Sequence, residues 1–126
     1  MKRTTIATTA LAALLMGLPL ASPAAAGDDE KIRTGACSGT ADWKLKVKPD
    51  DGRLELEAEV DSNVNGQEWT WRIRHNGSLS ARGTSTTVGP SGSFDVERRM
   101  ANLAGTDTFR FRAVHGSQVC LGRIRW

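Results

Sequence analysis

The sequence contains no tyrosine and only two cysteines, two histidines and three phenylalanines among its 126 residues. It also lacks the G-x-S-x-G motif of α/β-hydrolases and the H-E-x-x-H motif of zinc proteases. Its length allows one domain and excludes a multi-domain enzyme. Both histidines, His75 and His115, flank predicted turns, where we expect them to be exposed, and they are too far apart in sequence for a metal site. We therefore expect no catalytic activity, no cofactor and no metal.

The chain also lacks an apolar run long enough to span a membrane. Residues 6–20 are uncharged, but this run of 15 residues is shorter than the roughly 20 that a transmembrane helix needs. Lys2 and Arg3 precede the run, and small residues follow it at 24–26. This pattern is typical of a secretory signal peptide, and we expect cleavage after Ala26. No cysteine lies near that point to carry a lipid, so the mature protein is expected to be secreted and extracellular, without a membrane anchor.

The charge of the mature chain is close to balanced. Loss of Lys2 and Arg3 reduces the 17 basic residues to 15, against 14 acidic ones, which leaves a net charge of +1 over residues 27–126. The overall charge thus gives little support for a nucleic-acid partner. The two halves differ, however: residues 27–68 have a net charge of −5 and residues 69–126 a net charge of +6, and all nine basic residues of the second half are arginine.

The two cysteines, Cys37 and Cys120, predict one intramolecular disulfide. An even number of cysteines in a small secreted domain indicates disulfide bonding, and two cysteines allow only one internal pairing. The bond would close a loop of about 84 residues, for which chain entropy gives a stabilisation of roughly 4–5 kcal/mol. It would join the beginning of the domain to its last strand.

Apolar and polar residues alternate with period two along most of the mature chain, as in Trp43, Leu45 and Val47. Turn-forming sequences separate the alternating runs, including Asn76-Gly77. We expect a flexible N-terminal arm over 27–35 and a domain over 36–126, with seven strands near 43–48, 54–60, 69–74, 79–87, 94–97, 109–113 and 119–125. One buried and one solvated face per strand predicts an all-β, seven-stranded antiparallel β-sandwich, with a five- to eight-stranded barrel as the main alternative.

One segment is similar to a signature of immunoglobulin domains. The spacing of Asp107, Phe109, Phe111 and Ala113 resembles the D-x-A-x-Y-x-C pattern of the sixth strand of that fold. Trp71 follows Ala58 by 13 residues, close to the distance from the second-strand cysteine to the core tryptophan. The resemblance implies an immunoglobulin-like sandwich in which alanines replace the usual inter-sheet cysteines and the tyrosine hydroxyl is missing.

The mature chain also resembles, nearly end to end, a family of small secreted actinobacterial proteins of unassigned function. The resemblance rests on short strand and turn patterns: Gly35-Ala-Cys37-Ser38, Trp43-Lys-Leu-Lys46, Asp51-Gly52-Arg53-Leu-Glu55-Leu-Glu57, Glu59-Val60-Asp61, Gly66-Gln67-Glu-Trp69, Pro90-Ser-Gly-Ser-Phe94 and Arg112-Ala113. It implies an extracellular location and a β fold, and it brings no catalytic residues.

Arginines form the main candidate site. If the third, sixth and seventh strands share a sheet, six arginines would project from its outer face: Arg72, Arg74, Arg110, Arg112, Arg123 and Arg125. Guanidinium groups bind phosphate and sulfate through paired hydrogen bonds, so this face is a candidate site for an anionic polymer. No aromatic residues alternate outward with them, so we expect no nucleic-acid partner. The alternative is a solvated face that limits sheet aggregation.

Two further patterns have simpler interpretations. Lys44, Lys46 and Lys48 are predicted to lie opposite Glu55, Glu57 and Glu59 on the other sheet, where opposite charges stabilise the strand register. Residues 61–66 match the first half of a calcium-binding loop, but the position of its closing carboxylate holds an arginine and a strand follows, so a plain turn explains this segment better.

The Ser/Thr/Gly-rich stretch 83–93 is the best candidate for a recognition loop, although a flexible connection explains it more simply. We therefore expect a secreted, non-catalytic binding or structural module whose ligand is not identified by the sequence. Two alternatives specify the partner: inhibition of another extracellular protein through the 83–93 loop, or binding of an anionic cell-envelope polymer through the arginine face.

Overall fold

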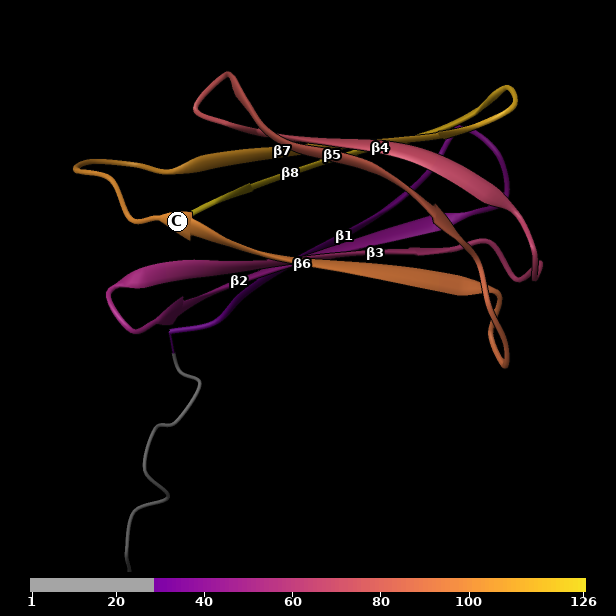
Figure 1. Cartoon of the computed structure of the whole chain (residues 1–126), viewed down its shortest axis with the longest axis horizontal. Helices are drawn as coiled ribbons and strands as arrows, with labels where there is room; N and C mark the ends of the chain where they lie inside the picture. The colour runs from indigo at the N-terminus through magenta and orange to yellow at the C-terminus, as the bar shows by residue number, and fades with distance from the viewer. Residues whose placement is uncertain (1–28) are drawn as a thin grey trace, which may run out of the picture.

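The structure, a computed structural model, describes residues 29–126, and the predicted signal peptide lies outside these described residues. The described chain is all-β, with two four-stranded antiparallel sheets that pack face to face as a β-sandwich (Figure 1). Its strands are β1 (Lys31–Ala36), β2 (Asp42–Asp50), β3 (Arg53–Asp61), β4 (Glu68–His75), β5 (Ser78–Thr86), β6 (Ser93–Ala101), β7 (Thr108–His115) and β8 (Gln118–Arg125). Over residues 29–126 no helix has the length and apolar character required to cross a membrane.

The strands divide into two separate sheets, which we call sheet A and sheet B. Sheet A has the order β1-β2-β3-β6, and sheet B has the order β5-β4-β7-β8. Two separate sheets confirm the predicted sandwich over the alternative of a closed barrel. The predicted third, sixth and seventh strands correspond to β4, β7 and β8, which are direct neighbours in sheet B, as the arginine prediction requires.

The core lies between the sheets and follows from the period-two alternation. In β3, Leu54, Leu56, Ala58 and Val60 are fully buried, and the residues between them reach the outer surface of sheet A. Sheet B contributes large side chains from its inner face, among them Trp69, Trp71, Ile73, Phe109 and Phe111. Both tryptophans of β4 thus pack inward, as expected for apolar residues that alternate with polar ones along a strand.

The structure has eight strands where the sequence analysis expects seven, and the additional strand is β1. Lys31–Ala36 pairs with β2 along its whole length, with Lys31 opposite Val47 and Ala36 opposite Asp42. The expected flexible arm over 27–35 thus contains a strand from Lys31 onward. Nearly all side chains of β1 are exposed, so the strand has no apolar alternation by which sequence could reveal it. It forms through backbone pairing at the sheet edge.

The predicted disulfide between Cys37 and Cys120 is present. It connects the turn after β1 to β8, so it joins one strand region of sheet A to an edge strand of sheet B. Backbone hydrogen bonds reinforce this connection, because the Ser38 amide donates to the Val119 carbonyl at 2.8 Å. The Val119 amide in turn donates to the Ser38 hydroxyl at 2.9 Å.

The charge ladder on sheet A also has the predicted register. Lys44, Lys46 and Lys48 lie opposite Glu59, Glu57 and Glu55, respectively. Lys46 Nζ lies 3.2 Å from a carboxylate oxygen of Glu57, and Lys48 Nζ lies 3.9 Å from Glu55. The hydrogen bond and the negative charge of Glu57 raise the pKa of Lys46 above its ordinary value, against a smaller opposing effect of burial.

Candidate anion-binding face

The outer face of sheet B holds all six arginines that the sequence predicts for the candidate site. Each of them is exposed, and they come from the three adjacent strands β4, β7 and β8: Arg72, Arg74, Arg110, Arg112, Arg123 and Arg125. In β8 the buried residues are Cys120, Gly122 and Ile124. This inward set directs Arg123 and Arg125 outward, and it leaves Leu121 outward as well, with 64% of its surface exposed.

A seventh arginine, Arg82 of β5, joins this face, and it is not among the six predicted from the sequence. Strands β4 and β5 pair from the Asn76-Gly77 turn outward, but their register shifts between Ile73 and Arg74. One extra residue in β5 reverses the side-chain alternation beyond that point. As a result, Arg82 lies directly opposite Arg72 and is exposed. The serine- and threonine-rich sequence of β5 has no apolar alternation that could have indicated this orientation.

The same shift places Gly83 on the inner face, opposite Trp71. A Cβ atom on Gly83 would lie 2.7 Å from Trp71 Cζ2, so only glycine fits beneath the indole ring. The indole nitrogen of Trp71 donates a hydrogen bond to the Ser85 hydroxyl at 3.0 Å. Packing against Trp71 therefore supports the register that brings Arg82 outward.

Six of the seven arginines form two rows that cross the strands, and Arg125 lies outside these rows, opposite Thr108. In the first row Arg72 lies opposite Arg82 on one side and opposite Arg112 on the other. In the second row Arg110 lies opposite both Arg74 and Arg123. These are four like-charge cross-strand pairs, and charges of the same sign at directly opposite positions destabilise a sheet.

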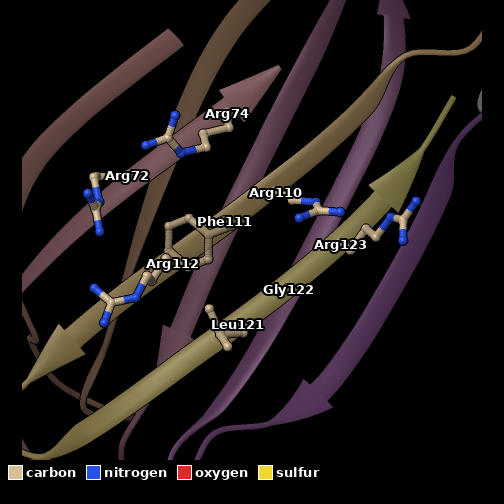
Figure 2. A pocket seen from close by; sticks show the side chains of 8 residues that line it. All are labelled: Arg72, Arg74, Arg110, Phe111, Arg112, Leu121, Gly122 and Arg123. Carbon is tan, nitrogen blue, oxygen red and sulfur yellow. The ribbon is translucent and has the colours of Figure 1, made fainter. Parts of the chain in front are cut away.

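One hollow lies between the two rows, and another lies on the far side of the first row. The first has a volume of about 450 Å³, and Figure 2 shows its arginine side chains on three neighbouring strands, with Leu121 beside them. Its lining residues are Arg72, Arg74, Arg110, Phe111, Arg112, Leu121, Gly122 and Arg123. The second hollow, of about 640 Å³, lies toward β5 and shares Arg72 and Arg112 with the first. The hollows are thus neighbours on one continuous surface.

None of the seven arginines forms an ion pair in the part of the chain that the structure describes. Arg74 donates one hydrogen bond, at 3.3 Å, to the carbonyl oxygen of Gly77 in the adjacent turn. Their guanidinium groups are therefore available to an external anion. Arginine suits phosphate and sulfate because its planar group donates two parallel hydrogen bonds to such an anion.

The expectation that both histidines are exposed is wrong, because each is partly buried: His115 Nδ1 lies 2.7 Å from the carbonyl oxygen of Glu68, and His75 contacts Asp107. His75 Nε2 lies 2.6 Å from Oδ1 of Asp107, which is fully buried, and the His75 ring stacks on Phe109 with centroids 4.5 Å apart. The same carboxylate oxygen accepts a hydrogen bond from the Leu103 amide at 3.2 Å. This pair attaches the end of β4 to the segment before β7. Sequence could not reveal it because the two residues are 32 positions apart.

The segment 87–92, within the predicted 83–93 recognition loop, is held by hydrogen bonds to the preceding loop. The Gly66 amide donates to the Thr87 carbonyl at 2.7 Å, and the Ser62 amide donates to the Gly92 carbonyl at 2.9 Å. Residues 83–86 belong to β5, so the loop is shorter than expected. In the preceding loop, the Asp61 carboxylate accepts a hydrogen bond from the Asn63 amide at 3.0 Å, which is the turn geometry expected in place of a calcium site.

No family model, no curated protein and no solved structure matches this chain.

Proposed function

We propose that this protein is a non-catalytic binding module that holds an anionic polymer against the outer face of sheet B. The observation that carries the proposal is the group of seven exposed arginines on that face, none of which pairs with a carboxylate within residues 29–126. Multiple guanidinium groups on one surface suit a ligand with several phosphate or sulfate groups.

The outer face of sheet A supports this proposal by contrast. There, lysines lie directly opposite glutamates, and an arginine of β6, Arg99, makes a 2.9 Å ion pair with Asp50. Two like-charge pairs, Glu57 with Glu97 and Glu59 with Asp95, also lie on this face, but each of these glutamates of β3 has a lysine of β2 opposite it on its other side. Mixed charges of this kind are sufficient to keep a protein soluble and to prevent its sheets from associating with those of other molecules. Sheet B instead aligns arginine with arginine in four cross-strand pairs. An anionic ligand relieves that repulsion, so the uncompensated arrangement favours binding over a purely solvated face.

The test is retention of the mature domain on an immobilised polyanion across a salt gradient. The binding variant changes Arg72, Arg74, Arg110 and Arg112 to glutamine. The control variant removes the same amount of positive charge from sheet A, with four substitutions to glutamine: Lys44→Gln, Lys48→Gln, Arg53→Gln and Arg99→Gln. Circular dichroism verifies that both variants are folded.

We expect the wild type and the sheet A variant to elute at high salt and the sheet B variant to elute near the void volume. Salt weakens the interaction because it screens exposed charges, with a Debye length of about 10 Å at 0.1 M and about 3 Å at 1 M. Equal retention of the two variants would attribute binding to net charge and refute the assignment to sheet B. Elution of the wild type at the void volume would refute polyanion binding.

We infer that the protein acts outside the cytoplasm after removal of residues 1–26. The disulfide between Cys37 and Cys120 supports this location, because such bonds persist in oxidising compartments. The resemblance to small secreted actinobacterial proteins agrees with it. N-terminal sequencing of protein from culture medium is expected to begin at Gly27, and an intact Met1 on cell-associated protein would contradict the inference.

We infer further that the sandwich is immunoglobulin-like. The division of β2, β3 and β6 from β4, β7 and β8 supports this, because it matches the A-B-E and C-F-G groups of that fold. Ala58 and Ala113, at the positions of the usual inter-sheet cysteines, are both fully buried. We expect an Ala58→Cys, Ala113→Cys variant to form a second disulfide, detectable by thiol titration, and two free thiols in the folded variant would contradict the assignment.

A second candidate function is inhibition of an extracellular protein through residues 87–92, the part of the predicted 83–93 loop that lies between β5 and β6. Val88 favours it, because this apolar residue is 61% exposed on a segment that hydrogen bonds hold in place. Capture of a protein from culture medium that persists at high salt, and that a Val88→Asp variant loses, is the expected result for this function. Capture that salt abolishes would instead support the arginine face.

A further inference from the structure

The basic surface does not end at the edge of sheet B. A third hollow, of about 860 Å³, lies between β8 and β1, and it shares Leu121 and Arg123 with the first hollow. Its additional cationic residues are Lys31, Arg33 and Arg125. The three hollows are therefore contiguous, from β5 across β4, β7 and β8 to β1 on the other sheet. We call this surface the basic track.

The basic track has nine cationic lining residues: Lys31, Arg33, Arg72, Arg74, Arg82, Arg110, Arg112, Arg123 and Arg125. Strands lie about 4.8 Å apart and packed sheets about 10 Å apart. The track thus covers about 14 Å across the four strands of sheet B and about 10 Å more around the edge to sheet A. A single small anion would contact only one part of a surface of this length, whereas a linear polymer would follow it.

The chemistry of the lining narrows the ligand class. No carboxylate or carboxamide side chain lines the three hollows within the described part of the chain, and Thr34, Thr70 and Thr84 provide the only side-chain hydroxyls. The arginine and lysine groups donate hydrogen bonds and cannot accept them. A sugar chain rich in hydroxyl groups would therefore find few acceptors. Phosphate groups, which at neutral pH act as acceptors, match the track.

The lining also disfavours nucleobases. Trp71 and Phe111 reach the hollows but are almost completely buried, and Trp43 packs its indole ring against Gly35 and Gly122. Stacking of bases requires exposed aromatic faces. The surface therefore fits a phosphate backbone whose repeating units have no aromatic group.

We propose that the basic track binds a linear phosphate polymer without aromatic groups, which crosses sheet B and continues over β8 onto β1. This proposal rests on the anionic-polymer function assigned above and specifies its ligand and its path. Binding along the whole track makes affinity depend on polymer length, because each additional phosphate contact releases counterions and adds to the interaction.

The experiment measures the affinity of the mature domain for triphosphate, short-chain polyphosphate and long-chain polyphosphate, at several salt concentrations. Two variants alter the ends of the track: Arg82→Gln at β5, and Lys31→Gln with Arg33→Gln at β1. One variant alters the centre: Arg72→Gln with Arg112→Gln. The control variant, Lys44→Gln with Arg53→Gln, removes two positive charges from the outer face of sheet A and away from the track.

We expect affinity to rise at least tenfold from triphosphate to long-chain polyphosphate. Either end variant should weaken long-chain binding several-fold and by a larger factor than it weakens triphosphate binding, and each lost phosphate contact should reduce the salt slope by about one. The central variant should weaken binding of all three ligands, and the control variant should bind as the wild type does.

Three outcomes would overturn the proposal. Equal affinity for triphosphate and long-chain polyphosphate would indicate a site for one small anion and would refute binding along the whole track. Anion binding by the face itself would still be supported. Tighter binding to heparin or to vesicles of anionic phospholipid than to polyphosphate of equal charge would assign the face to a sulfated glycan or to a membrane surface. Absence of binding to polyphosphate, heparin and anionic vesicles alike would overturn the proposed function as well.

Discussion

The arginine rows predict that one substitution to glutamate stabilises the protein while it removes the binding site. Arg112 lies directly opposite Arg72, with Arg74 and Arg123 on the diagonals of the sheet. Cross-strand charge pairs change stability by roughly 0.2–1 kcal/mol each. In Arg112→Glu one repulsive pair becomes attractive and two diagonal contacts improve, so we expect the free energy of unfolding to rise by about 1 kcal/mol.

For a domain of this size, 1 kcal/mol raises Tm by about 4–8 °C. The matched control is Lys46→Glu on sheet A, which changes the net charge by the same amount. It removes the 3.2 Å ion pair with Glu57 and adds a carboxylate close to Glu55 and Glu57, so we expect its Tm to fall by a similar amount. Thermal unfolding monitored by circular dichroism at low salt measures both variants.

The direction in which each variant shifts Tm distinguishes an effect of local charge pairing from an effect of net charge. If both variants move Tm in the same direction, net charge and not local pairing controls stability. If Arg112→Glu lowers Tm, repulsion between the arginines does not destabilise sheet B. The difference in charge pairing between the two sheets would then no longer support a binding function. Both shifts should diminish at 1 M salt, where the Debye length is about 3 Å. A gain in stability with loss of polyanion binding would be the trade-off typical of a binding surface.

Three further predictions concern the rest of the fold. Reduction of the bond between Cys37 and Cys120, which are 83 positions apart, should lower the free energy of unfolding in urea by roughly 4 kcal/mol, and a loss below about 1 kcal/mol would refute its role. Asp107→Ala leaves two donors, His75 Nε2 and the Leu103 amide, without their acceptor, so we expect a loss of about 3 kcal/mol in the same assay, and an unchanged midpoint would contradict it. The pKa of Lys46 is raised in the folded state, so its charge stabilises the protein fully below the unfolded pKa near 10.5, and this contribution disappears as pH rises through the folded value. The stability difference between wild type and Lys46→Gln should therefore shrink above about pH 10.5, and a difference independent of pH would exclude this linkage.

Much of the candidate site could be predicted from sequence because alternation is a local property. Trp71 and Ile73 must face a core, so Arg72 and Arg74 must face solvent on the same strand. The same reasoning orients Arg110 and Arg112 around Phe111. That these arginines lie on one sheet could only be assumed from the sequence, because it depends on the order of the strands. That order results from pairing between segments that are far apart in sequence, and a local pattern of residues does not reveal it.

Arg82 and β1 mark the limit of that reasoning. The Asn76-Gly77 turn by itself would bring Arg82 opposite Trp71, with its side chain toward the core, and only the extra residue in β5 turns it outward. Strand β1 has almost no buried side chain, so its pairing with β2 leaves no pattern in the sequence. Without these two elements the basic track would lose both of its ends.

The sequence by itself determined seven of the eight strands, the faces of most of them and the only available disulfide, since these depend on local alternation and on a count of two cysteines. The tertiary structure decided which strands are neighbours, the outward position of Leu121 and the buried contact between His75 and Asp107. It also decided that seven arginines from four strands share one surface. The physical reason is that the register and order of strands come from packing between sheets and from backbone pairing across long sequence separations.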